Sequence, residues 1–176
     1  AAAASVGREG EPPAEVSLDG QAHAVSTDAE GRVWIELDPP SVVQIDPPVE
    51  TITAALGLDV EQVAPVVERA PVAVTTGASA HLIIPVTYLS ALAALAVDIG
   101  ALRTLCRSHG ADAVFCYSFD TLTQRAAVHG RPVPLEQAHP VASATGAFAC
   151  ITALQSVGAL GGISETVVVE QADHWG

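Results

Sequence analysis

Ser143 to Leu160 read SATGAFACITALQSVGAL, a run of small and apolar residues that decides the fold. A helix of this length extends about 27 Å at 1.5 Å per residue. Apolar residues lie on nearly every side of such a helix, and a helix that is hydrophobic all round must be enclosed by other elements. We therefore expect one buried helix over residues 143–160, with sheet on several sides.

Short strand-like segments occupy much of the remaining chain. Three short segments with alternating side chains, 15–18, 21–27 and 32–37, are separated by the hairpin signals Asp19-Gly20 and Glu30-Gly31. This pattern predicts an antiparallel meander. Apolar periodicity then predicts helices over 50–56, 60–63, 89–97 and 99–108, and strands over 42–45, 72–75, 81–86, 113–119, 126–131 and 166–170. Many short strands around one small-residue helix are typical of an α+β fold with a mostly antiparallel sheet wrapped around a central buried helix.

Proline pairs at 39–40 and 47–48 forbid helix and mark a domain crossing. We expect residues 1–40 to be the remainder of an N-terminal lobe, and residues 41–176 to form a C-terminal lobe around the helix. The sequence lacks an initiator Met and opens inside an Ala run. From this we expect a fragment that starts within a helix.

Composition excludes several functional classes. The chain has twenty acidic residues and seven basic ones, all of them Arg, which gives a net charge of −13. Nucleic-acid binding relies on cationic side chains, so nucleic acid is not an expected partner. No run reaches the roughly 18 apolar residues of a membrane span, and no secretory pattern opens the chain. Three cysteines without metal-type spacing are expected to be reduced and buried in a cytoplasmic protein.

The start of the enclosed helix is the best candidate site. Ser143 can cap the helix, and the small residues Ala144 and Thr145 leave backbone N–H groups open to an anion, so a small carboxylate is the expected ligand. The alternative is that Ser143 is only a cap and that the small residues only allow close packing. No metal, nucleotide or flavin motif is present, so we expect no cofactor and no metal.

Residues 128–147 carry a family resemblance, because VHGRPVP at 128–134 leads to HPVASATGA at 139–147. This resembles the second-domain signature of the PhzF-like (phenazine biosynthesis) isomerase family, in which a His-x-Arg strand leads to Glu-Asp-Pro-(Val/Ala)-Thr-Gly-Ser-Ala and the central helix. Supporting matches are the helix at 50–58, Thr76-Gly77 with the strand at 81–86, and Glu170-Gln171.

The resemblance implies a diaminopimelate-epimerase-like fold with two lobes, and cofactor-free isomerisation or epimerisation of a small carboxylated substrate by proton transfer. It implies substrate binding by Ser143, Ala144 and Thr145, by Arg131 and by Gly77, and it allows a homodimer. The Glu and His that the family's first lobe contributes would lie before Ala1.

This sequence departs from the pattern at the expected carboxylate, where Ala138-His139 replaces Glu-Asp. Imidazole titrates near neutral pH, so His139 can act as the acid or base; the alternative is a solvent-facing loop histidine. His129 and Arg131 share one face of a strand and either bind the anion or pair with acids. The rival function is a catalytically degenerate paralogue that binds a small anion or serves in assembly.

Overall fold

The computed structural model describes residues 14–18, 21–67, 70, 72–77, 79–136, 143–160 and 166–171. The chain divides into two compact units, residues 1–39 and residues 40–176. No helix in the described ranges is long and apolar enough to cross a membrane. The expected helical start at Ala1 lies outside the described residues, and the assignment of the first unit to another lobe stays a prediction.

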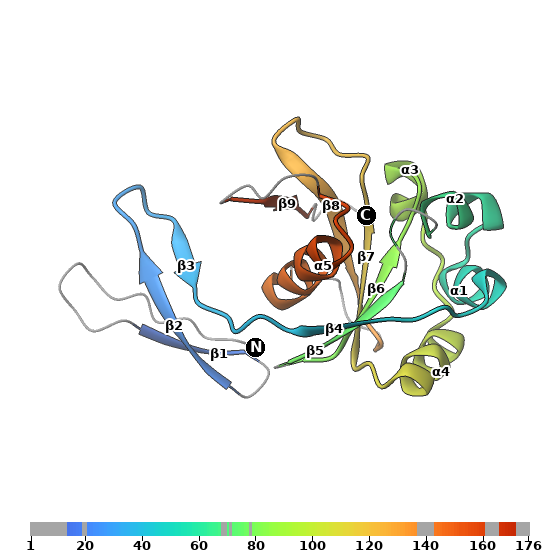
Figure 1. The fold of residues 1–176 in the computed structure, drawn as a ribbon, viewed down its shortest axis with the longest axis horizontal. Helices are drawn as coiled ribbons and strands as arrows, with labels where there is room; N and C mark the ends of the chain where they lie inside the picture. Colours follow the sequence, from blue (N-terminus) through green and yellow to red (C-terminus); the bar gives the residue numbers. More distant parts are fainter. Residues whose placement is uncertain are drawn as a thin grey trace. The chain divides into compact units, whose positions relative to one another are not determined.

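The first unit contains a three-stranded antiparallel sheet, which confirms the predicted meander (Figure 1). Its strands are β1 (Ala14–Leu18), β2 (Gln21–Thr27) and β3 (Val33–Ile35). Val25 is buried, whereas Val33 and Trp34 are about half exposed. Asp28 closes the β2–β3 turn, since its carboxylate accepts hydrogen bonds from the Arg32 amide and from the Trp34 ring N–H.

The second unit is built on a six-stranded mixed sheet in the order β4-β5-β6-β7-β8-β9. Three neighbouring pairs are antiparallel, while β6 with β7 and β8 with β9 are parallel. The strands are β4 (Ser41–Gln44), β5 (Ala73–Thr76), β6 (His81–Pro85), β7 (Ala113–Ser118), β8 (Ala126–Val133) and β9 (Val168–Glu170). The α+β class expected from the sequence is confirmed.

The helices of this unit begin and end at signals that the sequence carries. They are α1 (Val49–Leu56), the 3-10 helix η1 (Val60–Gln62), α2 (Ala64–Val67), α3 (Leu89–Ala93), α4 (Ile99–His109) and α5 (Ala144–Ser156). Asp98 caps α4 by accepting from the Ala101 amide at 3.0 Å. Gly57 and Gly110 end α1 and α4 in the left-handed conformation that glycine adopts without strain.

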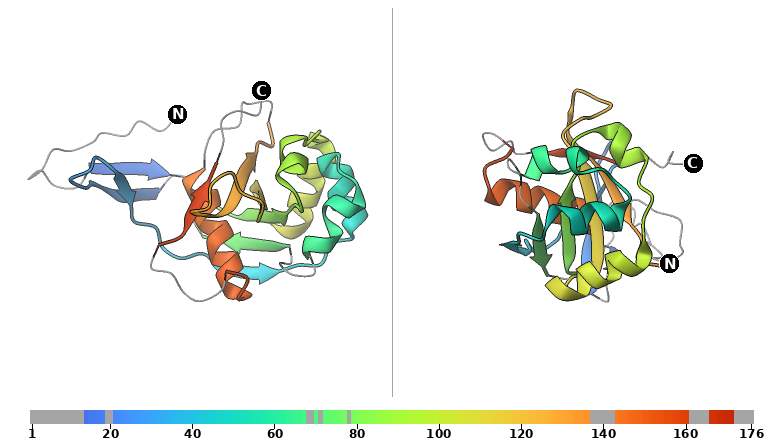
Figure 2. Two further views of the ribbon diagram at one scale, coloured as in Figure 1. Left: turned by 90° about the horizontal axis from the view of Figure 1, so that it is seen from above. Right: turned by 90° about the vertical axis from the view of Figure 1, so that its right-hand side faces the viewer.

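Alternation along the central strands divides the core into two layers. Leu82 and Ile84 of β6 pack with α1, α3 and α4, whereas Ile83 packs with α5. The same alternation in β7 sends Cys116 to the α4 side and Phe115 to the α5 side. In Figures 1 and 2, α5 accordingly covers one face of the sheet and the remaining helices cover the other.

The central helix is confirmed, with two differences from the prediction. It ends at Ser156 rather than near Leu160, because Gly158 has a φ of 70° and the chain turns there. Five residues are buried, namely Gly146, Ala149, Cys150, Ala153 and Leu154, while Ala147 and Ile151 are half-buried and Gln155 is exposed. Within the described residues the sheet lies on one side of α5 rather than on several, since β4, β5, β6 and β7, which α5 contacts, belong to one sheet.

The fully buried Phe115 ring fixes how closely α5 approaches the sheet. A Cβ atom at Gly146 in the first turn of α5 would lie 2.6 Å from Phe115 Cδ2, and a Cβ at Gly130 in β8 would overlap Phe115 Cζ. Both positions need glycine because the ring occupies the space of a side chain at each. The start of α5 is therefore held over β7 and β8.

We expect Gly130→Ala to lower the free energy of unfolding by about 1–3 kcal/mol, the usual range for overpacking a rigid core. The measurement is denaturant unfolding followed by circular dichroism. Gly77→Ala is the matched control, since a Cβ there would make an ordinary contact with Pro40 Cβ at 3.4 Å. Equal stability of the two variants would contradict the role of Phe115.

Candidate functional site

Ser143 caps α5 from an extended backbone conformation, with φ −118° and ψ 109°. Its Oγ accepts a hydrogen bond from the Gly146 amide at 2.9 Å. Among the described residues, no acceptor bonds the amides of Ala144 or Thr145 in this first turn. The helix start thus offers two N–H groups and the positive end of the helix dipole, which together favour an anion.

The side chain of Gln171 bonds both the backbone amide and the backbone carbonyl of Ser143. The Ser143 amide donates to Gln171 Oε1 at 2.8 Å, and Gln171 Nε2 donates to the Ser143 carbonyl oxygen at 3.2 Å. These bonds tie the end of β9 to the start of α5, although the two residues are 28 positions apart in the sequence.

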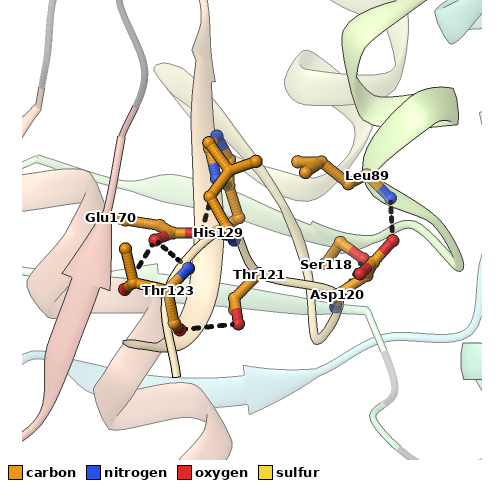
Figure 3. A network of polar contacts seen from close by, with 8 residues as sticks. Leu89, Ser118, Asp120, Thr121, Thr123, His129 and Glu170 are labelled. Carbon is orange, nitrogen blue, oxygen red and sulfur yellow. Dashed lines mark hydrogen bonds and ion pairs between the residues drawn. The ribbon is translucent and has the colours of Figure 1, made fainter. Parts of the chain in front are cut away.

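Glu170, the neighbouring residue, points to the other face of the sheet, because Val169 before it packs with α5. Figure 3 shows its contacts. Its carboxylate accepts from the Leu122 amide, and from the Thr123 amide and hydroxyl at 3.2 and 3.0 Å. It also pairs with Nδ1 of the fully buried His129 at 2.9 Å. Of the two alternatives for His129, binding an anion or pairing with an acid, the structure shows the acid pair.

The same loop between β7 and β8 is anchored at a second point (Figure 3). Asp120 accepts a hydrogen bond from the Leu89 amide at the start of α3, at 3.2 Å, and its own amide donates to Ser118 Oγ at 3.1 Å. Glu170 and Asp120 together fix this loop to β9 and to α3.

Burial alone would raise the pKa of Glu170, but the hydrogen bonds from Leu122, His129 and Thr123 outweigh it and leave the pKa below its ordinary value. A lowered carboxyl pKa means that the folded state favours the charged form. Stability from this group is therefore complete above the ordinary value and is lost as the pH falls through the folded value.

Arg131 lies on the face of the sheet that carries α3. It pairs with Cys116 across the β7–β8 ladder, and its Nη1 donates to the carbonyl oxygens of Leu92 and Ala93 at 2.6 and 2.8 Å. Ser143 begins α5 on the opposite face, where Val128 and Phe115 pack. The structure therefore does not bring Arg131 and Ser143 together, because the sheet separates them.

Gly77 lies at the other end of the sheet from the Glu170 network. It follows Thr76, which pairs with Ser41, and neighbouring ladders place His81 beside Ala113 at the start of β7. His129 pairs with Ser118 at the end of β7, so about 17 Å of strand separates the two ends. Gly77 is thus not brought to Ser143 either. His139 lies outside the described residues, and its role stays a prediction.

The three cysteines are free and buried, as predicted. Burial raises the pKa of Cys106 to about 11 and that of Cys116 to about 12, so both thiols stay protonated at neutral pH and are poor nucleophiles. Within the described residues, no group of three or more His, Cys, Asp or Glu side chains is placed to hold a metal ion.

The sequence matches no family model and no curated protein. Its structure is similar to the crystal structure of the Bacillus anthracis phenazine biosynthesis protein of the PhzF family. The TM-score is 0.55 at 12% sequence identity, over 70% of this chain and 42% of that one. The fold is that of a PhzF-family protein. The chain spans less than half the length of that structure.

The similarity confirms, at the level of the fold, the family resemblance carried by residues 128–147. The contacts of Glu170 and Gln171 were not predicted from the sequence, which singled these residues out only as a motif match. Alternation in the sequence indicates only that Glu170 points to the opposite face from Val169 and Gln171. The structure shows that Val169 packs with α5, so Glu170 points away from α5 and Gln171 toward it.

We expect Glu170→Gln to reduce the loss of stability on acidification. Wild type should lose more unfolding free energy than the variant as the pH falls from above 4.5, the ordinary Glu value, because the folded pKa of Glu170 is lowered. Urea titrations at several pH values measure the difference. Glu61→Gln, an exposed substitution in η1, is the control. Parallel pH profiles for wild type and Glu170→Gln would contradict this account.

Proposed function

We propose that this chain binds the carboxylate of a small molecule at the start of α5. The observation that carries the proposal is the capped first turn, where the amides of Ala144 and Thr145 have no acceptor among the described residues. Ser143 Oγ accepts a hydrogen bond from the Gly146 amide and lies 3.4 Å from the Thr145 hydroxyl oxygen, so two hydroxyl groups lie at the same helix start as the two amides.

We further propose that the reaction is cofactor-free isomerisation or epimerisation by proton transfer, in the cytoplasm. The PhzF-family fold supports the reaction class, and His139 is the candidate acid or base in place of the family's carboxylate. Residues 1–40 would be the remainder of an N-terminal lobe, and a homodimer is consistent with the family resemblance. Buried free cysteines suit a reducing compartment.

The second candidate is a protein that binds the anion without catalysis or that serves in assembly. Two observations favour it. Ala138-His139 stands where the family has acidic residues, and the Arg131 guanidinium is engaged by two backbone carbonyls of α3 instead of facing Ser143.

Benzoate is a suitable probe of the binding step. We expect it to raise the thermal midpoint of the wild-type protein, because a ligand that binds only the folded state stabilises it. Ser143→Ala should weaken binding by about 0.5–2 kcal/mol, the range for losing a cap or one hydrogen bond. Ser156→Ala, the same change at the far end of α5, is the matched control and should bind as wild type.

Solvent-deuterium exchange separates the two candidates. An isomerase should incorporate deuterium at the acidic α-carbon of a small carboxylic acid, and His139→Ala should abolish the incorporation while His109→Ala in α4 leaves it unchanged. Binding without exchange would favour the non-catalytic protein. Failure of every carboxylate to bind would overturn both candidates.

A further inference from the structure

Glu170, the last residue of β9, and Gln171, which follows it, make polar contacts on opposite faces of the sheet. Glu170 bonds His129 and the loop at Leu122 and Thr123. Gln171 bonds only the backbone of Ser143 among the contacts of the described residues. The end of β9 and the residue after it therefore fix both the β7–β8 loop and the N-cap residue of α5.

The fit between Gln171 and Ser143 determines which way the side-chain amide points. Ser143 presents one backbone donor and one backbone acceptor, and the amide supplies one acceptor and one donor to match them. A flipped amide would oppose N–H to N–H and oxygen to oxygen. With Ser143 extended, the amide takes the place that a neighbouring strand residue has in an antiparallel ladder.

Fixing the Ser143 carbonyl also fixes the amide of Ala144. The two groups belong to one planar peptide unit, so the direction of the C=O sets the direction of the N–H. A hydrogen bond to that carbonyl also polarises the peptide unit and strengthens its N–H as a donor. The Ala147 amide donates to the same carbonyl oxygen at 3.0 Å, so Gln171 and the first turn of α5 together set the direction of one of the two amides that face the proposed ligand.

We propose that Gln171 is a positioning residue, which aims the Ser143–Ala144 peptide at the bound anion and is itself held in place by the contacts of Glu170. This inference rests on the proposed anion site and deepens it. Gln171 acts through Ser143 and does not need to touch the ligand. The bonds of Glu170 to the β7–β8 loop keep the short strand β9 in register, so that Gln171 stays opposite Ser143.

Gln171→Glu distinguishes a positioning role from a merely structural one, because only the positioning role predicts a loss of binding that depends on pH. Protonated Glu can accept from the Ser143 amide and donate to its carbonyl, whereas ionised Glu has no proton to donate and repels both the carbonyl and the anion. With benzenesulfonate as the probe, whose charge is constant over this range, Gln171→Glu should bind about 3–10-fold more weakly than wild type at pH 8. The ratio should return toward one as the pH falls below the pKa of the introduced Glu.

Gln171→Leu and Gln155→Glu complete the experiment. Gln171→Leu should bind weakly at every pH, since it can make neither bond. Gln155→Glu places the same charge at the exposed far end of α5 and should follow wild type. A Gln171→Glu ratio that does not change with pH, or wild-type affinity in Gln171→Leu, would overturn the positioning role.

Amide hydrogen exchange measured without ligand tests the positioning of Ser143 independently of whether the anion site exists. If Gln171 fixes Ser143, the Gly146 amide, which donates to Ser143 Oγ, should exchange faster in Gln171→Leu than in wild type, while the Leu102 amide in α4 is unchanged. Faster exchange together with no binding of benzenesulfonate or of any carboxylate by wild type would end the proposed function but leave the positioning of Ser143 supported. Unchanged exchange would overturn the positioning itself.

Discussion

The Phe115 ring is the contact on which the second unit depends. It is fully buried between β8 and the first turn of α5, and glycine at 130 and 146 leaves the space that the ring fills. A close-packed interior transmits such a constraint, because neighbouring groups have no free volume in which to shift. The position of the ring thus sets where α5 begins over the sheet, and this places Ser143 within reach of Gln171 at the end of β9.

Much of this fold was predictable because its signals are local. The helix at 49–56 ends at a glycine in the left-handed conformation, and Asp98 and Gly110 bound the helix at 99–109. Strand boundaries follow from alternation that each segment carries by itself. The start of α5 at Ser143 was predicted from its capping chemistry alone, and the structure confirms the cap.

The arrangement of the site was not predictable, because it depends on contacts between distant segments. His129 and Arg131 were expected on one face of a strand, but only the order of the sheet shows that this face is opposite α5. The pairing of Gln171 with Ser143, and that of Glu170 with His129 across 41 positions, likewise depend on where β9 joins the sheet. A single sequence carries no direct signal for such long-range pairs.

The charge of the protein explains why a backbone site suits an anion here. A net charge of −13 repels anions at long range, and the Arg131 guanidinium is engaged by backbone carbonyls inside the fold. Salt screens exposed charges beyond about 8 Å at physiological ionic strength, whereas hydrogen bonds from peptide N–H groups act at contact distance. Attraction at Ser143 is therefore short-range and survives the screening that removes the repulsion. Binding of an anion to a chain with this net charge should strengthen with salt, the opposite of the behaviour of a site built from arginine.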